Sequence, residues 1–212
     1  MNPPRSAKGF TLVELSIALV IIALLLGGMI VGGSSVMESA KISSLIGQIK
    51  DLSAASREFK TRYGYYPGDL PNAAIFITAD GGISAGCSYP ASSNVGNGIV
   101  DTATESACAL EHLVKARLLN KAALIGGSYV IQHPFGGGNV SLSVVTASNE
   151  NAIRVTGLPC SIALQIDSKM DNAAATPLGL GFVTGWDSSI ASIATCAPGG
   201  ANDPVPSLLI RY

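Results

Sequence analysis

The longest hydrophobic stretch of the chain lies near its start. The 23 positions from Leu15 to Met37 carry no charged side chain. At 1.5 Å per residue this run forms a helix of about 34 Å, enough for a hydrocarbon core of about 30 Å. It is longer than the roughly 7 to 15 apolar residues of a secretory signal peptide. We therefore predict a retained transmembrane helix, and Arg5 and Lys8 favour a cytoplasmic N-terminus and an exported C-terminal part.

After Met37 the pattern becomes amphipathic and stays helical to about Arg62. The apolar residues recur at a spacing that places them on one face, which predicts a stripe covering a sheet, although a coiled-coil partner could take the same stripe. Two glycines and two prolines between Tyr63 and Asn72 predict the end of the helix. The stripe consists of Ile42, Leu45, Ile46, Ile49, Leu52, Phe59 and Tyr63.

Residues 64–212 have the size of one globular domain. Residues 73–104 are predicted to form a surface loop that could include short strands. Glu105 to Leu119 are predicted to form a second helix. A third helix is expected from Cys160 to about Met170. The remaining apolar runs predict antiparallel strands, so the expected fold class is α+β, with the long N-terminal helix packed on the sheet. These strands are expected at residues 128–135, 140–144, 152–158, 180–186, 190–195 and 207–212.

Composition limits the functional classes. The 13 lysines and arginines against 14 aspartates and glutamates give a formal net charge of −1, so charge predicts no nucleic-acid partner. Charged residues make up 13% of the chain, about half of what is usual in soluble domains, which agrees with a membrane-contacting segment.

The junction before the apolar run places a carboxylate, Glu14, at the start of a membrane helix. Ionised groups in a bilayer are costly and usually have a partner. If the chain is cut between Gly9 and Phe10, the new α-amino group is a cation at neutral pH. In its own helix this amine lies at the positive end of the helix dipole, so the amine of a neighbouring copy would pair with Glu14 better.

The short basic leader, Gly9, Phe10, Glu14 and the apolar run resemble the class III signal of type IV pilins and type II secretion pseudopilins. Residues 65–72, Y-Y-P-G-D-L-P-N, also resemble the segment after the long helix in many pilin-like proteins. The resemblance implies that a prepilin peptidase cuts after Gly9 on the cytoplasmic side and that Phe10 is N-methylated. It also implies that Glu14 orients each incoming subunit against the N-terminus of its neighbour. The alternative is a single-pass anchor with an interfacial Glu14.

This resemblance divides the chain into a leader (1–9), a membrane and assembly helix (10–37), an amphipathic helix (38–63) and a head (64–212). Its expected partners are the peptidase, an inner-membrane assembly platform, and copies of itself or other pilins in a helical filament. Before assembly the head would lie in the periplasm, and afterwards in an extracellular pilus or a periplasmic pseudopilus.

Four glycines interrupt the apolar run, at Gly27, Gly28, Gly32 and Gly33. The Gly28 to Gly32 spacing is a G-x-x-x-G, which permits close approach of membrane helices. We favour a weak point in the helix, because each interior glycine costs about 0.8 to 1 kcal/mol relative to alanine. In the family that the signal resembles, this helix partly unwinds on assembly.

The four cysteines, Cys87, Cys108, Cys160 and Cys196, all lie in the part expected to be exported, where disulfides are stable. Three pairings are possible, and pairing of nearest neighbours joins Cys87 to Cys108 and Cys160 to Cys196. The second loop would resemble the disulfide-bounded C-terminal region of many pilins. The cysteine and histidine spacing does not predict a zinc site.

Nothing in the sequence predicts an enzyme or a cofactor. His112 and His133 lie outside recognisable catalytic motifs and are expected to be surface or packing residues. Some relatives bind calcium through glycine-rich loops, and the candidate oxygen ligands here, which show no ordered spacing, are Asp80, Asn94, Asn97 and Asp101.

The sequence thus favours a structural pilin, either a major or a minor subunit. A pseudopilin of a type II secretion system is the first alternative. A membrane-anchored binding module or tip adhesin, with the Cys87 to Cys108 loop as its contact surface, is the second.

Overall fold

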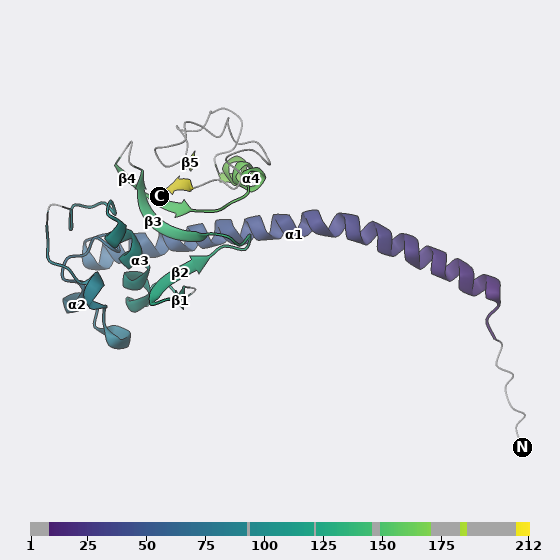
Figure 1. Cartoon of the computed structure of the whole chain (residues 1–212), viewed down its shortest axis with the longest axis horizontal. Helices are drawn as coiled ribbons and strands as arrows, with labels where there is room; N and C mark the ends of the chain where they lie inside the picture. The colour runs from purple at the N-terminus through teal and green to yellow at the C-terminus, as the bar shows by residue number, and fades with distance from the viewer. Residues whose placement is uncertain (1–8, 93, 121, 146–148, 171–182, 186–206) are drawn as a thin grey trace, which may run out of the picture. The chain divides into compact units, whose positions relative to one another are not determined.

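The computed structural model describes residues 9–92, 94–120, 122–145, 149–170, 183–185 and 207–212 (Figure 1). Contacts divide the chain into two units, Met1–Lys41 and Ile42–Tyr212, and each is described by itself. Helix α1 (Leu12–Tyr63) is 52 residues long and contributes to both. The predicted continuation of the apolar helix into an amphipathic one is confirmed.

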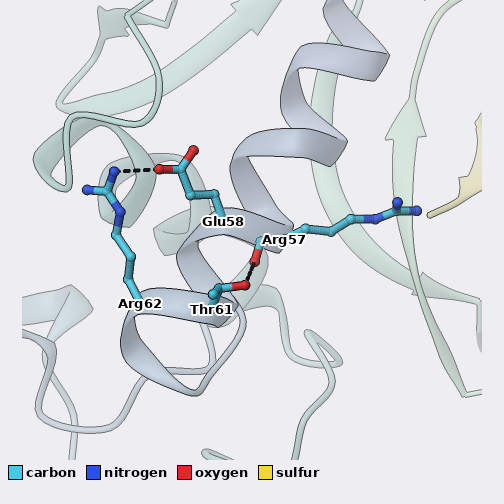
Figure 2. A network of polar contacts seen from close by, with 4 residues as sticks. All are labelled: Arg57, Glu58, Thr61 and Arg62. Carbon is cyan, nitrogen blue, oxygen red and sulfur yellow. Dashed lines mark hydrogen bonds and ion pairs between the residues drawn. The ribbon is translucent and has the colours of Figure 1, made fainter.

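Helix α1 ends where the sequence predicts. Gly64 has a φ of +81°, and its N–H donates to the carbonyl of Lys60 at 2.8 Å. A glycine in this left-handed conformation is a common way to terminate a helix and satisfy its last carbonyls. The exposed face of the final turns is polar: Arg62 pairs with Glu58, and the Thr61 hydroxyl donates to the Arg57 carbonyl at 3.0 Å (Figure 2).

The predicted apolar stripe of α1 is the centre of the head's core. Phe59 is fully buried, and its ring lies 4.5 Å from that of Tyr63 and 6.0 Å from that of His112, measured between centroids. Strand and helix residues from the rest of the head join the same cluster, so the stripe covers the chain's own sheet, as predicted. The fully or nearly fully buried members from α1 are Ile42, Leu45, Ile49, Leu52, Ala55 and Phe59.

The head has the predicted α+β arrangement, with antiparallel strands throughout. Among the described residues, the strand order is β1-β2-β3-β4-β6-β5. The helices after α1 are α2 (Ala73–Phe76), η1 (Ala79–Gly81), η2 (Ala85–Cys87), α3 (Ala103–Lys115) and α4 (Cys160–Met170). The strands are β1 (Ala123–Ile125), β2 (Ser128–Gln132), β3 (Asn139–Val145), β4 (Glu150–Val155), β5 (Val183–Gly185) and β6 (Leu208–Arg211).

Most predicted elements are present with shifted ends. Helices α3 and α4 and strands β2, β3, β4 and β6 overlap the predicted segments. Strand β2 stops at Gln132 rather than residue 135, because Pro134 has no N–H for a ladder and residues 133–136 form a turn. Strand β5 lies within the predicted 180–186 segment, and the predicted strand at 190–195 lies outside the described residues.

Two parts of the head differ from expectation. Residues 73–104 contain the short helices α2, η1 and η2, with an isolated bridge between Ser92 and Val95 instead of short strands. Strand β1, which pairs with β2, was not predicted. All three of its residues are exposed, so it has no alternation of buried and exposed positions for a sequence pattern to reveal.

We predict that Phe59→Ala lowers the free energy of unfolding by about 3 to 5 kcal/mol, because it leaves a cavity in the core that α1, α3 and the sheet share. The matched control is Ile75→Ala, an exposed apolar residue of α2, with an expected change within about 0.5 kcal/mol. Urea unfolding of the protein in detergent micelles measures both, and equal losses for the two variants would contradict this account of the core.

Candidate functional site

The predicted cleavage bond lies just before α1. Gly9 and Phe10 have no regular secondary structure, and the helix starts at Leu12. Phe10 is 88% exposed and no heavy atom lies within 4 Å of a Cβ built on Gly9. A protease needs an accessible backbone segment that is not hydrogen-bonded in a helix. The structure therefore presents the Gly9–Phe10 bond in a form that a peptidase can reach.

Glu14 takes part in a capping arrangement that the sequence reasoning missed. The Thr11 hydroxyl accepts from the Glu14 N–H at 3.2 Å, while Glu14 Oε2 accepts from the Thr11 N–H and hydroxyl, both at 2.9 Å. This reciprocal pair is a capping box, which satisfies donors that the first helical turn leaves unpaired. Its signal was in the sequence, because T-x-x-E directly before an apolar run is a pattern typical of a helix start.

The first part of α1 exposes apolar side chains around its whole circumference. Among residues 12–26, Leu12, Leu24 and Leu25 are 89%, 73% and 64% exposed. Such a surface marks a segment that contacts lipid or other protein. Within the described residues, no helix meets the length and hydrophobicity needed to cross a membrane. The helix continues through Gly27, Gly28, Gly32 and Gly33, and their role as a weak point stays a prediction.

The first predicted disulfide is present in the head. Cys87 at the end of η2 and Cys108 in α3 are bonded, with their Cα atoms 5.3 Å apart. The bond closes a segment with a sequence separation of 21 residues and attaches it to α3. The second predicted pair stays a prediction, because Cys196 lies outside the described residues.

His112 connects the disulfide-closed segment to the turn after α1. Its Nδ1 accepts from the Gly68 N–H at 3.0 Å, and its Nε2 donates to the Cys87 carbonyl at 2.9 Å. A histidine that accepts at one nitrogen and donates at the other is neutral. Burial lowers the pKa of His112, and the Cys87 carbonyl and Glu111 partly offset this shift. It is a packing residue, as the sequence predicts, and His133 is buried as well.

Gly68 itself fits only as glycine. Its φ is +93°, and a Cβ at this position would lie 2.3 Å from the Glu105 carbonyl oxygen. The Tyr89 hydroxyl donates to the Gly68 carbonyl, and burial raises the pKa of that phenol. A histidine thus binds the N–H of Gly68 and a tyrosine binds its carbonyl. The positive φ and the close approach to Glu105 explain why this position of the 65–72 segment is glycine.

Asp69 fixes the loop that carries the predicted calcium ligands. Its carboxylate accepts from the backbone N–H groups of Gly96, of Asn97 at 3.2 Å and of Gly98 at 2.8 Å. Burial raises the pKa of Asp69 even though these donors oppose the shift. The sequence reasoning did not select Asp69, because its partners lie about 27 residues later in the chain.

Two of the predicted calcium ligands, Asn97 and Asp101, contact each other. Asn97 Nδ2 donates to Asp101 at 3.2 Å, and Asn97 Oδ1 accepts from the Ile99 N–H at 2.9 Å. The Asn94 N–H faces the Ser92 hydroxyl at 3.4 Å. In the part of the chain that the structure describes, no three His, Cys, Asp or Glu side chains are arranged to hold a metal. Calcium binding, also through Asp80, stays an untested prediction.

A family model described as the prokaryotic N-terminal methylation motif matches residues 4–30. The chain carries the signature of type IV pilins and pseudopilins. The matched segment contains Gly9, Phe10, Thr11 and Glu14, so the exposed bond and the capping box both lie inside the methylation motif. Proteins with this motif are generally processed by a prepilin peptidase and assembled into filaments. No curated protein and no solved structure matches the chain.

We predict that part of the head's stability is lost as the pH falls from about 7.5 to 5.5, through the ordinary histidine pKa of about 6.5. The folded pKa of His112 is lowered, so the unfolded chain takes up the proton first and acid favours unfolding. His112→Gln keeps a donor and an acceptor but cannot titrate, and should flatten this dependence. The midpoints of urea unfolding at several pH values measure this pH dependence of stability in both proteins.

The matched control for this titration is Ile75→Ala, an exposed α2 residue without a titratable group, which should retain the pH dependence of the unmodified chain. An unchanged pH profile in His112→Gln would show that the assignment to His112 is wrong.

Proposed function

We propose that the protein is a non-enzymatic structural subunit of a type IV pilus or a related filament. The observation that carries this proposal is the methylation motif at residues 4–30, placed at the start of a 52-residue helix whose other end is the core of a folded head. Cleavage after Gly9 and N-methylation of Phe10 produce the mature subunit. The accessible, non-helical Gly9–Phe10 bond supports cleavage at this position.

Before assembly, residues 10–37 anchor the subunit in the bacterial inner membrane, with the head in the periplasm. The exposed apolar side chains at the start of α1 support this placement, since they need lipid or protein contacts in place of water. Arg5 and Lys8 keep the N-terminus on the cytoplasmic side, where the peptidase acts. The inner-membrane assembly platform then transfers the helix from lipid into the filament.

In the filament, Glu14 pairs with the methylated amine of a neighbouring copy. The capping box supports this role, because it fixes the carboxylate at the first turn of α1 through Thr11. A methylated amine stays cationic, so the ion pair persists after modification. Apolar side chains around α1 then pack against other copies, and the weak point at Gly27 to Gly33 lowers the cost of local unwinding.

The second candidate function is that of a pseudopilin in a type II secretion system. The methylation motif favours it equally, because it is the signature of both classes. In that case the filament is short and periplasmic, and the same processing and assembly residues act. Loss of surface filaments on deletion of the gene indicates a pilin, and loss of protein secretion a pseudopilin.

We predict that Gly9→Leu leaves the leader attached, because a bulky side chain at the cleavage site blocks the peptidase. The measurement is the intact mass of protein recovered from the native membrane or a sheared surface fraction. The unmodified chain should start at Phe10 with one added methyl group, and the variant at Met1. A normally trimmed variant, or an unmodified chain that retains its leader, would contradict the processing proposal.

We also predict that Glu14→Val is inserted and processed normally but enters filaments at least about tenfold less efficiently, since a lost ion pair of about 1.4 kcal/mol already has this effect. The matched control is Glu58→Val at the exposed end of the same helix, which should assemble normally. Quantitative immunoblots of sheared filaments and membranes measure both. Undiminished incorporation of the Glu14 variant would show that the carboxylate does not guide docking.

A further inference from the structure

The hairpin formed by β1 and β2 exposes apolar side chains at its tip. Residues 123–128 are all exposed, and Leu124 and Ile125 are 63% and 47% exposed. The two strands are joined by Gly126 and Gly127, whose φ angles of +58° and +85° fit a two-residue hairpin turn. No heavy atom lies within 4 Å of a Cβ built on either glycine, so space is open around the turn. Large apolar side chains exposed side by side indicate a contact surface.

A cavity between α1 and α4, here called the α1–α4 cavity, has a volume of about 280 Å³. It is lined by Ile46 and Lys50 of α1 and by Lys169 and Met170 of α4. Ile46 and Met170 are half-buried and pack against the core, so they supply its apolar surface. Both lysines are exposed, and neither has a hydrogen bond or an ion pair with any of the described residues. The cavity therefore combines an apolar surface with two ammonium groups that are available as donors.

The hairpin and the α1–α4 cavity belong to the same unit, Ile42–Tyr212, but lie on different sides of it. Figure 1 shows β1 and β2 on one side of the second half of α1 and α4 on the other. If the hairpin of one copy bound in the cavity of another, the two copies would use different surfaces. Such a heterologous contact repeats into an open helical filament when its rotation does not close.

The hairpin and the cavity also agree in size and polarity. A cavity of about 150 Å³ accepts a benzene molecule, so about 280 Å³ has room for a leucine side chain. The hairpin has no charged side chain from residue 123 to 132, and its two glycines leave the carbonyls of the turn uncovered. A lysine ammonium has three donors and no acceptor, so these carbonyls are suitable partners for it.

We propose that the β1–β2 hairpin of one copy binds in the α1–α4 cavity of the next copy in the filament. It rests on the proposed function, because the contact requires a filament. Leu124 enters the cavity and loses its contact with water, which stabilises the contact. Lys50 and Lys169 donate to the carbonyls of the glycine turn. This contact joins heads to each other and is distinct from the contacts of residues 10–37.

The first test replaces Leu124 of the full chain by the photoreactive p-benzoylphenylalanine and irradiates whole cells that assemble it. The sheared and membrane fractions should contain a covalent dimer. Mass spectrometry of its peptides should join position 124 of one copy to Ile46 or Met170 of another. The control carries the same photoreactive residue in place of Ile75, which is exposed on α2, and should give no cross-link to these two residues.

The second test uses two charged residues at one exposed position. Leu124→Glu and Leu124→Lys both remove the apolar side chain, but only the new lysine is repelled by Lys50 and Lys169. Incorporation of Leu124→Lys into filaments should be at least about tenfold lower than that of Leu124→Glu, a difference of about 1.4 kcal/mol. In a chain that also carries Lys50→Glu and Lys169→Glu, this order should reverse. Quantitative immunoblots of filament and membrane fractions measure incorporation.

The outcomes separate this contact from the proposed function. Filaments without a cross-link from position 124 to Ile46 or Met170 would overturn the hairpin contact and leave the proposed function intact. The same order of Leu124→Glu and Leu124→Lys in both backgrounds would also overturn it, because the lysines of the cavity would then not face the hairpin. If the unmodified chain formed no filament at all, the proposed function and the hairpin contact would both be wrong.

Discussion

The head of this protein depends on burial of one stripe of α1. Six residues from Ile42 to Phe59 are removed from water by the sheet and by α3. Full burial of a large apolar side chain contributes about 1.5 to 3 kcal/mol, so this stripe is among the largest sources of stability in the head. Its spacing also determines which face of the helix the sheet must cover. The strands can therefore close only around the second half of α1.

Residues 12–26 of α1 have no buried stripe, so the described parts of this helix have two kinds of surface. Apolar side chains are exposed all around residues 12–26, and the capping box of Thr11 and Glu14 satisfies the first turn. A helix that is apolar all round is suited to lipid or to a bundle of similar helices. This difference explains how one element can assemble a filament at one end and organise a globular head at the other, as we propose.

The contacts that order the region after α1 are mostly polar. His112, Tyr89 and Asp69 hold the turn at Gly68 and the loop at residues 96–98, and the Cys87–Cys108 bond attaches the same region to α3. Buried polar groups of this kind are stable only when their partners are in place. The region after α1, which has few periodic apolar residues, is thus ordered by hydrogen bonds and a disulfide. The hydrophobic core alone does not specify it.

The difference between the apolar core and the polar contacts explains which parts of the fold could be predicted from the sequence. Helix α1, the stripe, α3, α4 and most strands could be predicted because each depends on the spacing of residues close together in the chain. The Cys87–Cys108 pair also agrees with sequence expectations. Thr11 was predictable from a local motif and was missed. Asp69 had no local signal, because the groups that it binds come from a distant loop.

The sequence by itself determined the two surfaces of α1, the α+β class and the methylation motif at residues 4–30, since side-chain periodicity and a short motif are local properties. Only the tertiary structure decided where β2 leaves β3, how the 96–98 loop folds onto Asp69, and that β1 extends the sheet. These features depend on contacts between distant segments. Their energies come from pairing and burial that no single segment contains.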